Sequence, residues 1–172
     1  MTLKRMLAVL AVMCALIVAV FAIQGQRVSP HETIDATIGG KKVSITYGRP
    51  SLKGRKAVGG ELVPFGKVWR TGADEATMLT TDGDLMIGSL HVPAGSYALF
   101  TLPSETGWKL IVNKTSKQWG AFSYKEADDL GRVDMKVGKM AAAVEQFTIS
   151  LTGGVLKMEW ENTSASVDVK AK

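Results

Sequence analysis

Cysteine and histidine are nearly absent from this 172-residue sequence. Cys14 is the only cysteine, and His31 and His91 are the only histidines. Because Cys14 lies in an apolar N-terminal stretch, the rest of the chain can form neither a disulfide nor a cysteine-ligated metal site, and it holds no thiolate nucleophile. His31 lies beside the N-terminal tail and His91 in an expected strand, so the histidines have no zinc-ligand spacing and argue against a Ser-His-Asp triad. No metal and no cofactor is therefore expected.

Charge is missing from one long stretch near the N-terminus. Residues 7–23 are 17 apolar residues without a charge; they follow Lys4 and Arg5, and small or branched residues precede residue 23. This pattern predicts that residues 1–22 form a signal peptide. The run is also long enough for a retained anchor. Both alternatives predict an exported protein, periplasmic or secreted, because the positive charge stays on the inner side of the membrane.

The remaining chain has the size of one domain and the pattern of a β protein. We expect a mobile leader over residues 23–30 and a β-sandwich domain over residues 31–172. Apolar and polar residues alternate with period two, and turn signals recur every eight to twelve residues, which is typical of a sandwich or barrel. The expected strands are residues 33–38, 42–47, 76–81, 85–87, 90–92, 96–102, 108–112, 132–137, 144–151, 155–161 and 165–169.

These strands predict a mainly β fold, a single jelly-roll or Ig-like sandwich of about nine to eleven short strands preceded by a signal helix. Gly39-Gly40, Gly88-Ser89 and Gly153-Gly154 are expected as tight turns. Only residues 125–130 and 138–144 have a pattern that permits a turn or two of helix.

Positive charge is concentrated in one segment, residues 48–72, which we call the basic loop. It contains six glycines, two prolines and six cations against one acid, Glu61. Long connections inside compact domains are uncommon and are often functional. Two interpretations stay open: the arginines tie the loop to the sheet through Asp74, Glu75 or backbone carbonyls, or they form a pocket for an anionic group, with glycine amides as further donors.

The four tryptophans divide in a similar way. Trp108 and Trp160 lie in alternating strands and are expected in the core. Trp119 lies in a polar, glycine-containing connection, where an exposed indole can stack on a sugar. It can therefore line the same cleft as Trp69 and Arg70, or it can pack as part of a lid. Arg132 follows two aspartates, which favours a structural ion pair over a position facing the basic loop.

Several blocks of sequence resemble a known bacterial family. They read "ITYGRPSLKGR", "LVPFGKVWRTGADEAT", "VPAGSYALFTLP", "NKTSKQWGAFSY" and "GRVDMKV". In order and spacing they are similar to domain of unknown function 2911, over residues 30–170. The resemblance implies an exported, mostly β domain, and it does not point to any particular activity. The chain departs from the family pattern at Asp74, where the family has asparagine, so a carboxylate replaces a neutral amide donor.

Together these features predict a non-catalytic binding or structural module of the bacterial envelope. Its expected partner is a small anionic or saccharide-like ligand, or an envelope protein. Nucleic acid is not expected, because the excess charge sits in one loop, and membrane contact is expected only through an uncleaved N-terminal segment. The alternative is a hydrolase or lyase that uses Asp74 or Glu75 with Arg70. The predicted ligand-binding residues are Arg49, Lys53, Arg55, Trp69, Arg70, Asp74, Glu75, Trp119 and Arg132.

Overall fold

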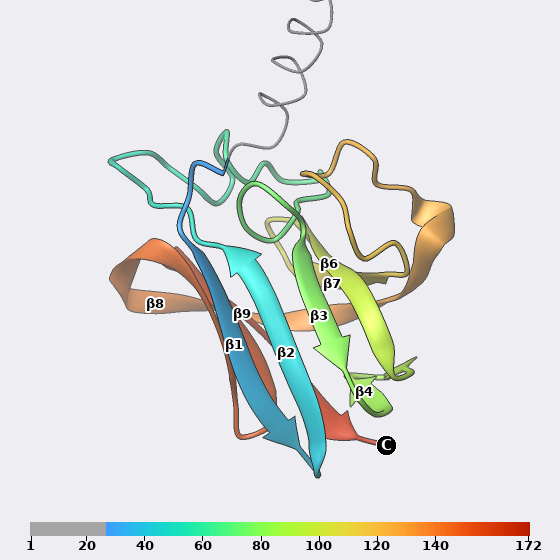
Figure 1. Cartoon of the computed structure of the whole chain (residues 1–172). Helices are drawn as coiled ribbons and strands as arrows, with labels where there is room; N and C mark the ends of the chain where they lie inside the picture. The colour runs from blue at the N-terminus through green and yellow to red at the C-terminus, as the bar shows by residue number, and fades with distance from the viewer. Residues whose placement is uncertain (1–26) are drawn as a thin grey trace, which may run out of the picture.

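The computed structural model describes residues 27–172, which form one open antiparallel sheet of nine strands (Figure 1). The strand order is β1-β2-β3-β6-β7-β8-β9-β4-β5. The strands are β1 (His31–Ile38), β2 (Lys41–Gly48), β3 (Thr77–Thr81), β4 (Leu85–Ile87), β5 (Leu90–Val92), β6 (Gly95–Pro103), β7 (Trp108–Asn113), β8 (Asp129–Thr152) and β9 (Val155–Ala171). A single 3₁₀ turn, η1 (Glu126–Asp128), precedes β8.

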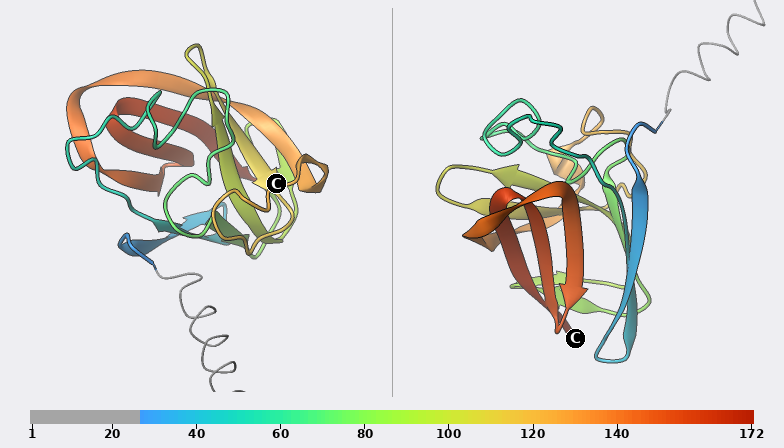
Figure 2. Two further views of the ribbon diagram at one scale, coloured as in Figure 1. Left: turned by 90° about the horizontal axis from the view of Figure 1, so that it is seen from above. Right: turned by 90° about the vertical axis from the view of Figure 1, so that its left-hand side faces the viewer.

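The predicted mainly β fold is confirmed, and its strands belong to one continuous sheet. A jelly-roll or Ig-like sandwich has two separate sheets, whereas here the single sheet bends until β1 and β2 lie across from β8 and β9 (Figure 2). Tyr47 on β2 spans this gap, since its hydroxyl accepts a hydrogen bond of 3.0 Å from the amide of Ile149 on β8. The core therefore lies inside the bend.

Two glycine pairs make the tight hairpins that the sequence predicts. Gly39 and Gly40 join β1 to β2 with φ of 53° and 82°, and Gly153 and Gly154 join β8 to β9 with φ of 60° and 75°. Positive φ at both central positions is the condition for a type I′ turn, whose twist matches that of the flanking strands. Glycine adopts this conformation without steric cost.

The last part of the sheet differs from the prediction. Four expected strands are merged into β8 and β9, which are 24 and 17 residues long. The expected helical segment 138–144 lies inside β8, and the ladder with β9 contains irregularities on both sides of Val144. The two ends of this segment pair with β9, Gly138 with Ser164 and Val144 with Glu161, so the tertiary partner overrides a weak local preference. The other expected helical segment, 125–130, contains η1.

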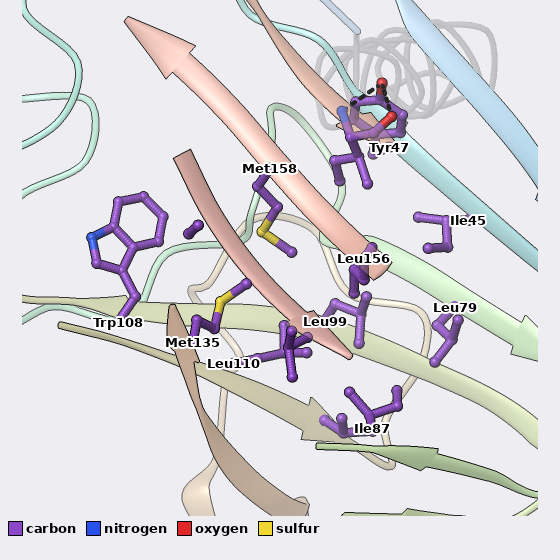
Figure 3. Packing of buried hydrophobic residues seen from close by; sticks show 14 of the residues in the cluster. Ile45, Tyr47, Leu79, Ile87, Leu99, Trp108, Leu110, Met135, Leu156 and Met158 are labelled. Atoms are coloured by element: carbon purple, nitrogen blue, oxygen red, sulfur yellow. Dashed lines mark hydrogen bonds between the residues drawn. The ribbon is translucent and has the colours of Figure 1, made fainter. Parts of the chain in front are cut away.

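The core combines aliphatic and aromatic side chains from both sides of the bend. Leu99 and Leu110 lie opposite Leu156 and Met158 of β9 (Figure 3). Trp160 and Trp108 are buried, as predicted. Burial of this apolar surface is the main force that keeps the sheet bent, because the described chain contains no disulfide.

The N-terminal expectations fall largely outside the described chain. The predicted signal peptide, residues 1–22, lies outside the described residues. Within residues 27–172 there is no helix with the length and apolarity that a bilayer crossing requires. The last residues of the expected leader are fastened to the domain, since the amides of Val28 and Ser29 donate to Asp74 Oδ2 at 3.2 and 3.1 Å.

Candidate functional site

A cavity of about 420 Å³ lies where β1 begins and β2 ends. Its walls come from the leader, from the segment before β3 and from the loop after β7, so residues far apart in sequence surround it. Apolar and titratable groups both reach it. The lining residues are Arg27, His31, Thr46, Tyr47, Gly48, Glu75, Ala76, Met78, Ser116, Lys117, Gln118 and Trp119.

Glu75 and Trp119 face each other in a short antiparallel bridge. The amide of Ala76 donates to the carbonyl of Gln118, and the amide of Gly120 donates to the carbonyl of Asp74, both at 2.9 Å. Residues directly opposite in such a pair project their side chains to the same side. This pairing explains why the carboxylate and the indole line one cavity, and Trp119 remains 38% exposed there.

His31 is held between two acceptors at the cavity wall. Its Nδ1 lies 3.0 Å from the carbonyl of Ser29, and its Nε2 lies 3.0 Å from Glu75 Oε2. A carbonyl oxygen and an ionised carboxylate can only accept hydrogen bonds. Each ring nitrogen of His31 therefore faces an acceptor. These contacts fix the orientation of the His31 ring against Glu75. The carboxylate of Asp74 lies 4.0 Å from Nδ1, so a second acidic side chain lies beside the ring.

Glu75 is an ionised group at neutral pH. Burial raises the pKa of its carboxyl, but the hydrogen bond from Arg27 and the positive charges of Arg27 and His31 outweigh that effect and leave the pKa lowered. Arg27 Nε donates to Glu75 Oε1 at 2.8 Å. The cavity wall therefore presents a carboxylate that accepts hydrogen bonds and does not donate them.

Asp74 supports the site from outside the cavity. Its φ is 62°, in the left-handed region where asparagine and aspartate are the favoured non-glycine residues. Its side chain accepts hydrogen bonds from the backbone amides of Val28 and Ser29. A carboxylate can accept both of these hydrogen bonds, so an aspartate at position 74 fits both the backbone conformation and these contacts.

Two arginines of the basic loop are used to fasten it. Arg49 donates to the carbonyl of Phe147 at 3.2 Å and to Thr148 Oγ1 at 2.9 Å, and it forms an ion pair of 3.1 Å with Glu32. Arg55 donates to the carbonyls of Leu52 and Ser51, both at 3.0 Å. Neither arginine lines the cavity. These contacts favour the interpretation in which the arginines tie the loop down.

Trp69 and Arg70 lie away from the cavity. Trp69 is only 7% exposed and stacks on Trp160 at a centroid distance of 5.9 Å, so it belongs to the core. Its amide and carbonyl both pair with Thr101, which fixes the end of the basic loop to β6. Arg70 is half-buried; burial lowers the pKa of its guanidinium, although the charge of Asp74 opposes this.

Lys53 and Arg132 also lie outside the cavity. Lys53 is exposed, and its amide donates to Glu145 Oε1 at 2.8 Å. Arg132 donates to Asp129 Oδ2 at 2.9 Å and to the hydroxyl of Tyr124 at 2.7 Å. Arg132 thus forms the structural ion pair that the sequence favours. Of the nine predicted residues, the structure places Glu75 and Trp119 together at the cavity.

A comparison with family models identifies the chain. The model described as "Protein of unknown function (DUF2911)" matches residues 29–169. The chain belongs to the DUF2911 family. The resemblance noted from the sequence is thereby confirmed, and the match includes His31, Glu75 and Trp119. Searches of curated proteins and of solved structures found no match to this DUF2911 chain.

His31 is the main residue of the site that the sequence reasoning missed. The expected strand began at residue 33, which placed His31 beside the leader, whereas β1 begins at His31 itself. The polar residues His31, Thr33 and Asp35 share the period of two, and this extension of the alternation is the signal that would have found it. Within the described part of the DUF2911 chain, no three His, Cys, Asp or Glu side chains are grouped closely enough to hold a metal ion.

Proposed function

We propose that this DUF2911 protein is a non-catalytic binding module of the bacterial envelope whose cavity binds a small saccharide-like ligand. The observation that carries the proposal is the direct pairing of Glu75 with Trp119 at the wall of a cavity of about 420 Å³. Ligand pockets in proteins typically measure about 300–1,000 Å³. A cavity of this size accepts one or two sugar rings.

The two side chains offer the two kinds of contact that a sugar needs. The indole of Trp119 presents an apolar face to the C–H side of a pyranose ring. The ionised carboxylate of Glu75 accepts hydrogen bonds from hydroxyl groups, and such charge-assisted bonds are the stronger kind. Arg27 and Lys117 supply donors at the same wall, which admits both neutral and acidic sugars.

An anionic ligand held by the basic loop has less support. Arg49 and Arg55 donate to loop and sheet acceptors, and no residue of the loop except Gly48 lines the cavity. The loop acts instead as the support behind the site.

The hydrolase or lyase alternative also has less support from the geometry. A lowered pKa makes the Glu75 carboxylate a weak general base at neutral pH. The carboxylate of Asp74 already accepts hydrogen bonds from two backbone amides. Neither Asp74 nor Arg70 is among the residues that line the cavity.

The proposed location rests on the N-terminal sequence. The charge-free residues 7–23 after Lys4 and Arg5 support export or anchoring. We describe the fold as sandwich-like because the bend of the single sheet brings β1 and β2 across from β8 and β9.

A titration with sugars tests the proposed function. N-acetylglucosamine and glucuronic acid are added to the protein while the amide resonances of Glu75 and Trp119 are followed by NMR. Trp119→Ala is expected to weaken binding about tenfold, equivalent to about 1.4 kcal/mol, and Trp119→Phe is expected to restore most of it. Phe122→Ala is the control, since Phe122 lies on the same loop but does not line the cavity. Binding that perturbs neither resonance, or an absence of binding by both sugars, would overturn the proposal.

A further inference from the structure

The exposed apolar side chains of the protein gather at one end. In the described residues the exposed large hydrophobic side chains are Val28, Phe65, Trp119, Phe122 and Val137. All but Val137 lie on three segments, residues 27–30, 49–76 and 114–126, which we call the loop end. Figure 1 and the right view of Figure 2 place these segments at the same end of the molecule, where the described chain begins. Phe122 is 85% exposed and Val28 86%.

Positive charge gathers at the same end. The loop end carries ten lysines and arginines against four acids, whereas the other described residues carry nine against twelve. The charge of the described residues is therefore unevenly distributed: the loop end is basic, and the other described residues are acidic in sum. A surface that combines exposed aromatics with lysines is typical of proteins that lie on anionic membranes.

Most of the loop-end cations are free to meet an external partner. Among the described residues, no acidic side chain lies within ion-pair distance of the exposed cations Lys53, Lys56, Lys67, Lys114, Lys117 and Lys125. Elsewhere on the protein several cations are paired, as Lys109 is with Asp134 and Lys157 with Glu159. The unpaired charge thus points to a ligand surface of opposite sign.

The chain enters the domain at this end, a short distance from the apolar run. Three residues separate residue 23, the end of that run, from Arg27. Four Cα–Cα steps reach at most about 14 Å. If residues 7–23 are held in a bilayer, Arg27 and its neighbours are therefore held at the level of the lipid headgroups.

We propose that the loop end is a docking surface for an anionic lipid bilayer. Phe122, Phe65 and Val28 enter the interface between headgroups and acyl chains, and the unpaired lysines contact the lipid phosphates. This contact goes beyond attachment through the N-terminal segment, because it orients the domain. Each lysine near an anionic surface strengthens docking about fivefold, equivalent to about 1 kcal/mol.

The test uses the full chain in vesicles, with Cys14→Ser as the background so that a single thiol can be labelled. A fluorophore is attached at Phe122→Cys on the loop end or at Lys172→Cys at the opposite end (Figure 1). Brominated phosphatidylcholine serves as the quencher, with or without phosphatidylglycerol. The label at position 122 is expected to be quenched strongly only when phosphatidylglycerol is present, and the label at position 172 is expected to be quenched weakly in both lipids.

Charge reversal separates docking from simple tethering. Lys67→Glu with Lys114→Glu is expected to lower the docking constant at least about 25-fold and to abolish quenching at position 122. The matched control, Lys42→Glu with Lys170→Glu, changes the net charge equally at the other end and should leave quenching unchanged. A simple tether predicts the same quenching in both lipids and both double variants, and a protein partner predicts no lipid dependence. Either result would overturn the proposal.

Discussion

Tyr47 joins the two sides of the bent sheet through a single hydroxyl group. The phenol donates to Glu32 Oε2 at 2.8 Å and accepts from the amide of Ile149 at 3.0 Å. Burial raises its pKa to about 12, and the hydrogen bond to Glu32 acts in the same direction. The folded protein therefore retains a proton that an exposed phenol loses near pH 10.

Tyr47→Phe is expected to destabilise the protein at neutral pH and to flatten its alkaline pH dependence. Loss of the hydroxyl leaves the Ile149 amide without its partner, which costs about 1–3 kcal/mol. Because the folded pKa is raised, the stability linked to this proton is complete below pH 10 and is lost as pH rises through about 12. Chemical denaturation from pH 7 to pH 12 measures both effects.

Tyr124 also contributes to the alkaline loss of stability, because burial and the hydrogen bond to Asp129 raise its pKa to about 12. Burial also raises the pKa of Tyr97. The alkaline slope of Tyr47→Phe is therefore expected to fall and to retain the parts that Tyr124 and Tyr97 contribute. Tyr97→Phe, whose hydroxyl makes one hydrogen bond, to the carbonyl of Pro93, provides the comparison. An unchanged slope in Tyr47→Phe would contradict the assignment.

At the scale of elements, the basic loop behaves as part of the core. Trp69 stacks on Trp160, contacts Trp108 edge-on at 6.4 Å and lies 5.0 Å from Phe147. The backbone of Trp69 adds two hydrogen bonds to Thr101 of β6. The loop is therefore anchored where it ends, and Arg49 anchors it where it begins.

Trp69→Ala is expected to destabilise the protein by about 3–5 kcal/mol, because it leaves a large cavity among three aromatic rings. Trp119→Ala removes the same side chain from an exposed position and is expected to change stability by less than about 1 kcal/mol. Thermal and urea denaturation of the two variants provide the comparison. Equal losses would show that the loop is not fastened through Trp69.

The sequence predicts elements well where the signal is local. The hairpins at Gly39-Gly40 and Gly153-Gly154 follow from glycine pairs between alternating strands, and both are present. Segment 138–144 has no such signal: its three alanines suit a helix, and it is held in β8 by the pairing of its ends, Gly138 and Val144, with β9. Local pattern cannot reveal a partner that lies some 20 residues further along the chain.

The candidate site shows the same division. Trp119 and Glu75 could be singled out because an indole in a polar loop and a pair of adjacent acids after the basic loop are unusual in themselves. Arg49 has equally unusual surroundings in sequence, but its position depends on acceptors such as the Phe147 carbonyl, which no sequence pattern identifies. The bridge that joins Glu75 to Trp119 is likewise a long-range pairing.

At the scale of the molecule, the end of the chain completes the sheet. The last residues of β9 pair with β4, where Val169 lies opposite Ile87 and Ala171 opposite Leu85. Leu85 and Ile87 are both buried. The β4–β5 hairpin is thus attached to the rest of the sheet by the C-terminal residues.

Removal of residues 169–172 is expected to destabilise the protein by at least about 2 kcal/mol, since Val169 is buried and two core side chains lose their cover. Hydrogen exchange should show the loss of protection concentrated in β4 and β5. Lys170→Ala, which removes an exposed side chain and keeps the backbone pairing with β4, is the control and should leave these strands protected. Uniform loss of protection over the whole sheet would instead indicate that the hairpin is not a separate unit.

The fastening of residues 27–30 has a mechanical consequence. Arg27 and the amides of Val28 and Ser29 hold Glu75 and Asp74, so the incoming chain is itself part of the cavity wall. A force applied at residue 27 would therefore act directly on Glu75, through the contact with Arg27. The position of the incoming chain and occupancy of the cavity are coupled variables, each able to change the other.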